Sequence, residues 1–287
     1  MHQAMPVGAL KSVRVARLSF REKKCVLQKL RPAQRYSEFY GRKGEVDLDD
    51  PLLYHRLIEA EKFAYAQRAK LGDPAYVPEA LQLAQNMTRS SYSKLIMSLI
   101  KETSQPLEAY TDTLLHLPDD HGTSHVSAID KDSNAVACTS TINQIFGSMR
   151  ISPTLGIVWN DEMDDFSIPG TSNAFGIAPS PANYIEPGKR PMSTTAQAVI
   201  RMLLFNQTVK EAIDAPRLHN QFLPPVTLYE SSFPEEIIAN LTNAREQNMT
   251  STEKLKCVVQ ALLVGDDDYI YGNSDFRRQT STYPSGF

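Results

Sequence analysis

The residues with the clearest potential for chemistry lie in the run Asp120-His121-Gly122-Thr123-Ser124-His125. A threonine hydroxyl is a weak nucleophile inside a chain. If the bond between Gly122 and Thr123 is cut, the freed α-amine lies beside the hydroxyl and accepts its proton, so one residue supplies both nucleophile and base. Thr123 is therefore a candidate N-terminal nucleophile that cleavage after Gly122 would create. The alternative is an ordinary threonine at the start of a strand.

A β-hairpin is expected to position this threonine. Two segments with a strand pattern, 125–129 and 135–139, flank a polar stretch, Asp130 to Asn134, whose composition is typical of a turn. Thr123 then lies at the start of the first strand. His121 and His125 have the i, i+4 spacing of a helical zinc pair, but Gly122 and the strand pattern disfavour a helix, so we expect no metal site.

Helices are expected on both sides of this hairpin. Leu53, Leu57, Ala60 and Ala64 form one helical stripe, which Gly72-Asp73-Pro74 ends. The other predictions are helices at 90–101, 195–205, 209–213 and 234–244, a polar linker at 103–120, a loop rich in Pro and Gly at 168–191, and short strands in the C-terminal third.

The composition is that of a globular protein. The chain has 287 residues, 41% of them hydrophobic, and a net charge of −3, which favours no nucleic-acid partner. The three cysteines, Cys25, Cys138 and Cys257, are too few and too scattered for a disulfide framework. No run approaches the roughly 20 apolar residues of a membrane span, and no apolar signal segment follows Met1.

Two features bear on where the protein acts. Residues 1–50 are rich in Lys and Arg and form either a targeting or nucleic-acid-binding arm or a poorly ordered extension. Glycosylation sequons, which are used in secreted proteins, begin at Asn86, Asn206, Asn240 and Asn248.

Several longer motifs follow one another in a distinctive order. They are Thr123-Ser124-His125-Val126-Ser127, Thr139-Ser140-Thr141-Ile142-Asn143, Phe146-Gly147-Ser148, the segment Asn160 to Ser167, Pro179-Ser180-Pro181-Ala182-Asn183, Pro187-Gly188-Lys189, the segment Pro216 to Gln221, and Asp275-Phe276-Arg277-Arg278. In this order they resemble the gamma-glutamyltransferases, the threonine branch of the N-terminal-nucleophile hydrolases. The resemblance runs from about Tyr54 to the C-terminus, and residues 1–50 are unmatched.

The resemblance implies an α+β fold, the αββα sandwich of the N-terminal-nucleophile hydrolases, which is incomplete in this chain. The predicted helices and strands support this fold class. Residues 51–122 would be the C-terminal part of the large subunit and residues 123–287 the small catalytic subunit, both made from one precursor by autocatalytic cleavage. The implied reaction transfers the γ-glutamyl group of glutathione and related compounds to an amino acid, a dipeptide or water. No metal or organic cofactor is implied. The family location is the extracellular face of the plasma membrane or the secreted fraction, although this chain shows no signal or anchor.

The resemblance also assigns roles to single residues. Thr141 would hydrogen-bond the catalytic Thr123. Asn143, Glu162 and Asp165 would bind the α-ammonium of the substrate, whose three donors suit two carboxylates and an amide oxygen. The acidic run around Glu162 has a solvated turn as its alternative. Ser193, with Thr194 in place of a second serine, would bind the α-carboxylate.

The sequence departs from the family pattern in one important place. Family members stabilise the oxyanion with a Gly-Gly pair that follows the paired serines, but none of the thirteen glycines here is next to another. Thr194 runs directly into a helical pattern, which indicates a deleted segment. The family's arginine for the α-carboxylate, which lies early in the large subunit, is absent too. The alternative function is therefore an inactive homologue that acts as a binding partner or has no function.

Overall fold

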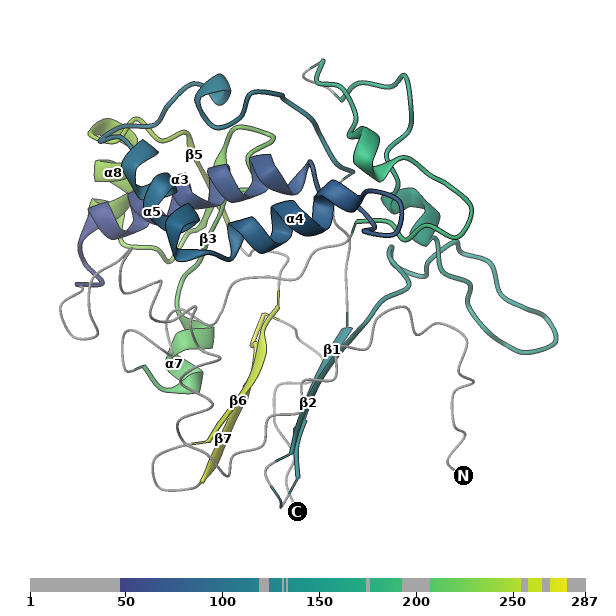
Figure 1. The fold of residues 1–287 in the computed structure, drawn as a ribbon. Helices are drawn as coiled ribbons and strands as arrows, with labels where there is room; N and C mark the ends of the chain where they lie inside the picture. The colour runs from purple at the N-terminus through teal and green to yellow at the C-terminus, as the bar shows by residue number, and fades with distance from the viewer. Residues whose placement is uncertain are drawn as a thin grey trace.

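The computed structural model describes residues 47–118, 124–130, 132, 134–173, 176–192, 207–253, 258–264 and 269–277. Helices and strands are both present in this part, which confirms the α+β class. The longer helices are α3 (Pro51–Arg68), α4 (Pro78–Met87), α5 (Ser90–Leu99) and α8 (Glu235–Asn243). They gather at one end of the molecule, and two β-hairpins extend away from them (Figure 1).

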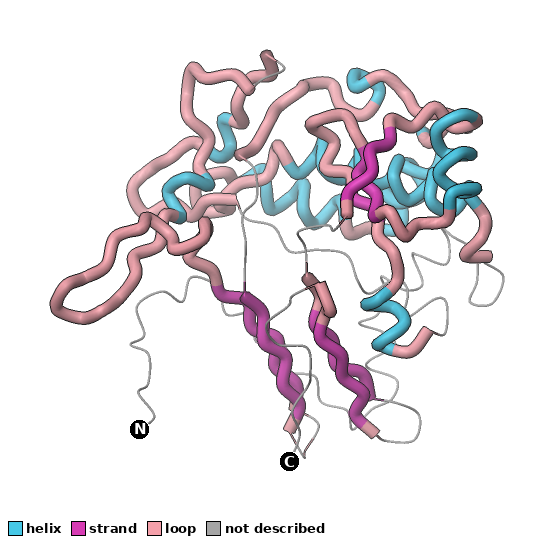
Figure 2. The backbone as a smooth tube through the Cα atoms, turned by 180° about the vertical axis from the view of Figure 1, so that it is seen from behind, coloured by secondary structure: helices cyan, strands magenta, loops and turns pink. Residues whose placement is uncertain are grey.

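The described strands form three small sheets. They are the antiparallel hairpin of β1 (Ser124–Ile129) and β2 (Ala135–Ser140), the sheet of β3 (Leu218–His219), β4 (Thr227–Glu230) and β5 (Met249–Thr252), and the antiparallel hairpin of β6 (Gln260–Val264) and β7 (Ile270–Ser274). The two hairpins lie side by side (Figure 2), yet no ladder pairs them within the described residues. Val126 on β1 and Val136 on β2 are exposed.

Helix α3 organises the core. Asp50 caps its N-terminus by accepting a hydrogen bond from the Leu52 amide at 2.9 Å, and Pro51 occupies the first helical position. The expected stripe is only partly right, because Ala64 is exposed whereas Leu53 is buried. The buried face also carries the polar side chains of His55, Glu59 and Lys62. A prediction based on apolar periodicity alone does not identify these residues as buried.

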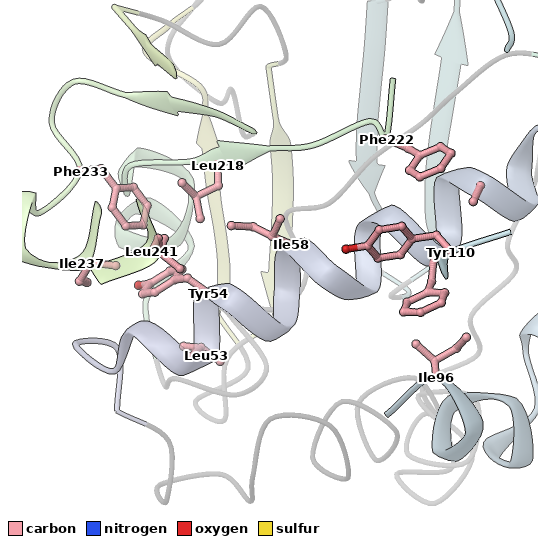
Figure 3. Packing of buried hydrophobic residues seen from close by; sticks show 12 residues of the cluster. Leu53, Tyr54, Ile58, Ile96, Tyr110, Leu218, Phe222, Phe233, Ile237 and Leu241 are labelled. Atoms are coloured by element: carbon pink, nitrogen blue, oxygen red, sulfur yellow. The ribbon is translucent and has the colours of Figure 1, made fainter. Parts of the chain in front are cut away.

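The hydrophobic core packs α3 against elements from both halves of the chain (Figure 3). Tyr54 meets Phe233 edge-to-face with ring centroids 5.0 Å apart, and Tyr110 lies 4.9 Å from Phe63. Leu241 of α8 is fully buried in the same cluster. The core therefore joins residues that precede position 122 to residues that follow position 123.

Most of the other expected elements are confirmed. They are α5, α8, the β1–β2 hairpin, the C-terminal strands and α7 (Val209–Asp214), whose Thr208 and Glu211 form a capping box. Helix α4 was not expected. The polar linker is wrong in part, because Tyr110 follows a 3₁₀ turn, η1 (Leu107–Ala109), into the core. The predicted helix at 195–205 lies outside the described residues. No helix in the described part is long and apolar enough to span a membrane.

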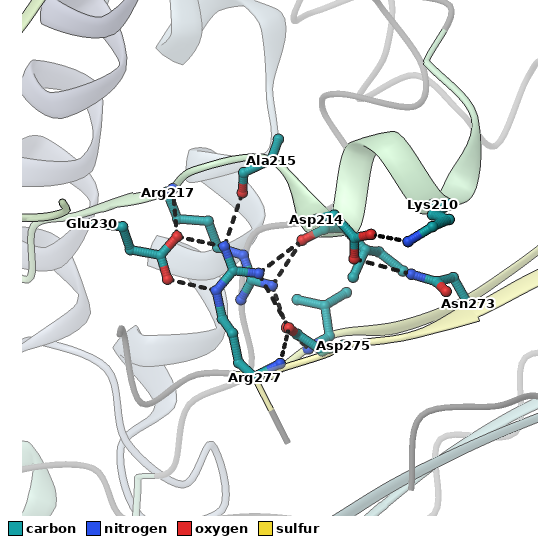
Figure 4. A network of polar contacts seen from close by, with 10 residues as sticks. Lys210, Asp214, Ala215, Arg217, Glu230, Asn273, Asp275 and Arg277 are labelled. Carbon is teal, nitrogen blue, oxygen red and sulfur yellow. Dashed lines mark hydrogen bonds and ion pairs between the residues drawn. The ribbon is translucent and has the colours of Figure 1, made fainter. Parts of the chain in front are cut away.

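A buried ion network ties the C-terminal hairpin to the rest of the fold (Figure 4). Arg277 contacts Glu230 with two guanidinium nitrogens and donates to Asp275 at 3.1 Å. Arg217 also contacts Asp275. Two motifs that carry the family resemblance thus meet in the structure, through Arg217 of one and Asp275 of the other. Each buried charge of the network has a partner of opposite sign.

Candidate active site

The site begins where the β1–β2 hairpin opens. Ser124 at the start of β1 pairs directly with Ser140 at the end of β2. Thr141 follows Ser140 and is therefore the first residue beyond the strand, which ends one residue later than the expected segment 135–139. Four of the predicted site residues, Gly122, Thr123, Ser193 and Thr194, lie outside the described residues.

A tight turn follows Thr141 and holds Asn143. The Asn143 amide donates to the Thr141 hydroxyl at 2.8 Å, and Asn143 adopts a left-handed conformation with φ of 70°. Asparagine tolerates this region better than most residues do. A Cβ on Gly147 would lie 2.3 Å from the carbonyl oxygen of Trp159, so the close approach of these two segments requires glycine.

This turn is hydrogen-bonded to the acidic segment. Asn143 Nδ2 donates to the Asp161 carbonyl at 3.3 Å, and the Gln144 amide donates to the Asp161 carboxylate at 3.1 Å. The acidic residues then form a 3₁₀ turn, η2 (Glu162–Asp165), which ends with Asp165 and Phe166 both buried. The structure thus brings Thr141, Asn143 and the η2 turn together, although they are about twenty positions apart in the sequence.

The loop after η2 is anchored on the C-terminal end of α3. Ser180 donates to the Ala69 carbonyl at 2.6 Å, and a Cβ on Gly72 would lie 2.4 Å from the Ala182 carbonyl oxygen. Arg190 binds Asp73 through Nε at 2.9 Å and Nη2 at 2.7 Å. These hydrogen bonds from Arg190 hold the pKa of Asp73 well below its usual range. The loop is therefore anchored at Ser180 and again at Arg190.

Sequence reasoning missed two residues of this arrangement. Gln144 Nε2 donates to Asp164 at 2.8 Å, and Asn183 donates from Nδ2 to the Asp165 carbonyl at 2.8 Å. Asn183 belongs to the motif that runs from Pro179 to Asn183, to which the resemblance assigns no role in the site. Its amide bonds to backbone groups that are distant in sequence, so no local pattern points to its contacts.

Two of the residues expected to bind an ammonium group are buried. Asn143 is 5% exposed and Asp165 is 7% exposed, and a buried carboxylate and amide oxygen are good acceptors for charge-assisted hydrogen bonds. Within the described residues, no three His, Cys, Asp or Glu side chains gather as metal ligands. An open groove of about 430 Å³ lies elsewhere, between Phe63, Leu95 and Tyr110, and none of the expected site residues lines it.

Comparison with known protein families identifies the family of this chain. The family model described as gamma-glutamyltranspeptidase matches residues 26–197 and 193–285. The chain belongs to the gamma-glutamyltranspeptidase family. The match begins at residue 26, so it includes part of the basic extension that we expected to be unmatched. The two matched stretches of this gamma-glutamyltranspeptidase sequence overlap at residues 193–197. This is the region in which we expected a deleted segment.

Related proteins cover most of this gamma-glutamyltranspeptidase family member. The glutathione hydrolase proenzyme of Arthroderma benhamiae is 36% identical over 242 residues, which are 74% of this chain and 41% of that protein. Scoloptoxin SSD14 of Scolopendra dehaani is 38% identical over 240 residues, or 71% of this chain and 40% of the toxin. The chain thus spans about two fifths of the length of these relatives.

A solved structure shares the fold at low sequence identity. The protein described as LmbA2991HD superposes with a TM-score of 0.62 at 16% identity, over 89% of this chain and 52% of that one. This likeness supports the arrangement of the helices and strands and carries no statement about activity.

Three of the four sequon asparagines lie in the described part of this gamma-glutamyltranspeptidase family member. Asn248 is exposed, and its Nδ2 donates to the Pro225 carbonyl at 2.8 Å. Asn86 near the end of α4 and Asn240 within α8 are half-buried. Asn206 lies outside the described residues.

Proposed function

We propose that this chain hydrolyses or transfers γ-glutamyl groups of glutathione and related compounds, with Thr123 as its nucleophile. The observation that carries the proposal is the set of hydrogen bonds that gathers Thr141, Asn143 and the η2 turn beyond the end of the β1–β2 hairpin. Thr123 directly precedes β1 in the chain. Because Ser124 pairs with Ser140, a nucleophile that directly precedes Ser124 would lie at the same end of the hairpin as Thr141, from which the turn and the acidic segment follow.

In the proposed reaction, the Thr123 hydroxyl oxygen attacks the carbonyl carbon of the γ-glutamyl amide. The α-amine of Thr123 takes the hydroxyl proton and passes it to the leaving amine. A γ-glutamyl ester forms, and cysteinylglycine leaves when glutathione is the donor. Water or the amine of an amino acid or dipeptide then attacks the ester and regenerates the hydroxyl. Thr141 orients the nucleophile in this scheme.

The proposed substrate contacts follow the chemistry of an α-amino acid. Asn143, Glu162 and Asp165 accept hydrogen bonds from its ammonium, and the hydroxyls of Ser193 and Thr194 donate to its carboxylate. The burial of Asp165 supports this role, because a carboxylate held away from water makes a stronger ion pair.

The proposal extends to the organisation of the chain. Cleavage after Gly122 separates residues 51–122, which form the C-terminal part of the large subunit, from the small subunit at 123–287, and the complete fold is an αββα sandwich. The two side-by-side hairpins support the second point, because they supply strands from both ends of the catalytic part. The sequons support a route through the secretory pathway to the cell surface or the medium.

Purified protein tests the proposal through its maturation. Wild type is expected to yield a fragment that starts at Thr123, seen on a denaturing gel and identified by N-terminal sequencing. Thr123→Ala is expected to remain one intact chain, whereas Thr123→Ser, which keeps a hydroxyl, is expected to be cut. Cleavage of Thr123→Ala at the same bond would show that another protease is responsible and remove the main support for a nucleophilic Thr123.

A further inference from the structure

Asn183 uses its whole side chain in hydrogen bonds inside the protein. It is the last residue of the 3₁₀ turn η3 (Pro181–Asn183) and is 1% exposed. Its Nδ2 donates to the Asp165 carbonyl at 2.8 Å and to the Ser167 hydroxyl at 3.2 Å. Its Oδ1 accepts from the Met192 amide at 3.0 Å. A buried amide with both ends satisfied is a rigid connector.

The two ends of this amide reach two different parts of the proposed substrate pocket. The donor end holds the backbone of Asp165, which completes the η2 turn. The acceptor end holds Met192, the residue that precedes Ser193 in the chain. In the proposed function, Asp165 binds the ammonium of an amino acid and Ser193 binds its carboxylate.

The substrate makes the relative position of these two parts important. The ammonium and the carboxylate of an amino acid are attached to one carbon atom, so their protein partners must be held at a fixed separation. Small errors in such a separation weaken binding and slow the reaction.

The connector is itself held from outside the pocket. Ser180, three residues before Asn183, donates to Ala69 at the end of α3, and Arg190, seven residues after it, binds Asp73. The Asn183 carbonyl also accepts the Ser167 amide at 3.1 Å. Asn183 therefore has a fixed position from which its side chain sets the positions of Asp165 and Met192.

We propose that Asn183 is a positioning residue that sets the distance between the ammonium-binding and carboxylate-binding parts of the γ-glutamyl pocket. It acts through the backbone of Asp165 and Met192 and does not touch substrate. This inference rests on the proposed function for its ligand. The coupling of the two segments through one side chain is measurable without any ligand.

Amide hydrogen exchange followed by mass spectrometry tests the coupling. In Asn183→Ala, the Met192 amide loses its acceptor and is expected to exchange about tenfold faster. The Ser167 amide keeps its backbone acceptor, and it is expected to exchange faster because the Asp165 carbonyl is no longer held by the connector. In Asn183→Asp, the carboxylate still accepts from Met192 but cannot donate to Asp165. Only the segment at 165–167 is then expected to exchange faster.

Two further variants keep this test decisive. Thr171→Val removes a hydrogen bond of 2.7 Å from an exposed hydroxyl of the same loop to the Ile168 carbonyl and is expected to leave Met192 exchange unchanged, with circular dichroism as the check of folding. If neither Asn183 variant folds, Ser167→Ala, which removes one acceptor, is expected to speed exchange at 165–167 alone. Unchanged exchange in both segments of Asn183→Ala, or in that segment of Ser167→Ala, overturns the coupling.

Calorimetry with L-glutamate tests the consequence for binding. Asn183→Ala and Asn183→Asp are expected to bind about tenfold more weakly than wild type, and Thr171→Val is expected to match wild type. Equal affinity in wild type and Asn183→Ala overturns the positioning role. If wild type binds no glutamate, the proposed function fails, and the exchange measurements still decide whether Asn183 couples the two segments.

Discussion

At the scale of single residues, Asp165 is the most sharply placed of the expected ligands. It is buried at the end of η2, whereas its neighbour Asp164 is exposed. This contrast gives a matched pair of variants, because the two carboxylates are adjacent in sequence and differ in their surroundings.

We predict that Asp165→Ala abolishes L-glutamate binding measured by calorimetry. A charge-assisted hydrogen bond contributes about 1.5–3 kcal/mol, so its loss weakens binding at least tenfold. Asp164→Ala is the control and should bind almost as wild type does. Equal binding by wild type and Asp165→Ala would mean that the acidic turn has no role in recognition.

The carboxyl group of Glu61 is expected to make the stability of the protein depend on pH. Its carboxylate receives one hydrogen bond, from the Asn220 amide at 3.3 Å, and burial raises its pKa from 4.5 to about 8. The folded state therefore binds a proton that the unfolded state releases between these two values. The contribution of Glu61 to stability is complete below pH 4.5 and is lost as pH rises toward 8.

We predict that Glu61→Gln removes this loss. The variant should melt a few degrees above wild type at pH 8.5 and close to it at pH 4.5, as measured by thermal denaturation. If the melting temperatures of wild type and variant stay equal from pH 4.5 to pH 8.5, Glu61 ionises as freely in the folded state as in the unfolded state.

At the scale of elements, helix α3 is held by polar contacts as well as by its apolar face. Lys62 donates to Glu59, Ser104 and Gln247, each at 2.8 Å. Burial lowers the pKa of Lys62, and the adjacent Glu59 opposes this effect. Tyr110 completes the cluster by donating to Glu59 at 2.8 Å, and burial raises its pKa.

We predict that Lys62→Met destabilises the protein by about 3–5 kcal/mol in urea denaturation, because Glu59 is left as an unpaired buried charge. Lys70→Met is the matched control, since Lys70 pairs with the largely exposed Asp112, and it should cost about 1 kcal/mol or less. Equal costs for the two variants would mean that Glu59 is rehydrated or neutralised when Lys62 is removed.

The sequence predicts the helices better than the contacts between them. Pro51, the apolar spacing and Gly72-Asp73-Pro74 were sufficient to place α3. The polar face with Glu59 and Lys62 was not predictable, because its partners Ser104 and Gln247 are remote in sequence. The hairpin was predictable because the turn at Asp130 is local: Asp130 accepts the Asn134 amide at 2.8 Å.

The same distinction applies to the candidate site. Asn143 and Asp165 were assigned through motifs, and the structure brings their two turns together through Asp161. Asn183 was not assigned, because its importance comes from two long-range bonds.

At the scale of the whole molecule, the missing Gly-Gly pair should limit catalysis. Charge that develops on the substrate carbonyl oxygen needs preorganised donors, and loss of one donor costs about 10²–10³ in rate. We predict that turnover of a γ-glutamyl anilide is far below that of an intact family member. A family-type Gly-Gly segment inserted after Thr194 should raise it. Activity of the unmodified chain equal to that of an intact enzyme would require another source of oxyanion stabilisation.

The hydrophobic core joins residues on the two sides of the bond between Gly122 and Thr123. Cleavage of that bond therefore changes how the stability of the protein depends on its concentration. Tyr54 packs on Phe233 and Lys62 binds Gln247, so each contact joins the two sides of that bond. In an intact chain these partners are tethered, and refolding is independent of dilution. After a cut they are separate molecules, so unfolding becomes a dissociation and the melting temperature falls as the protein is diluted.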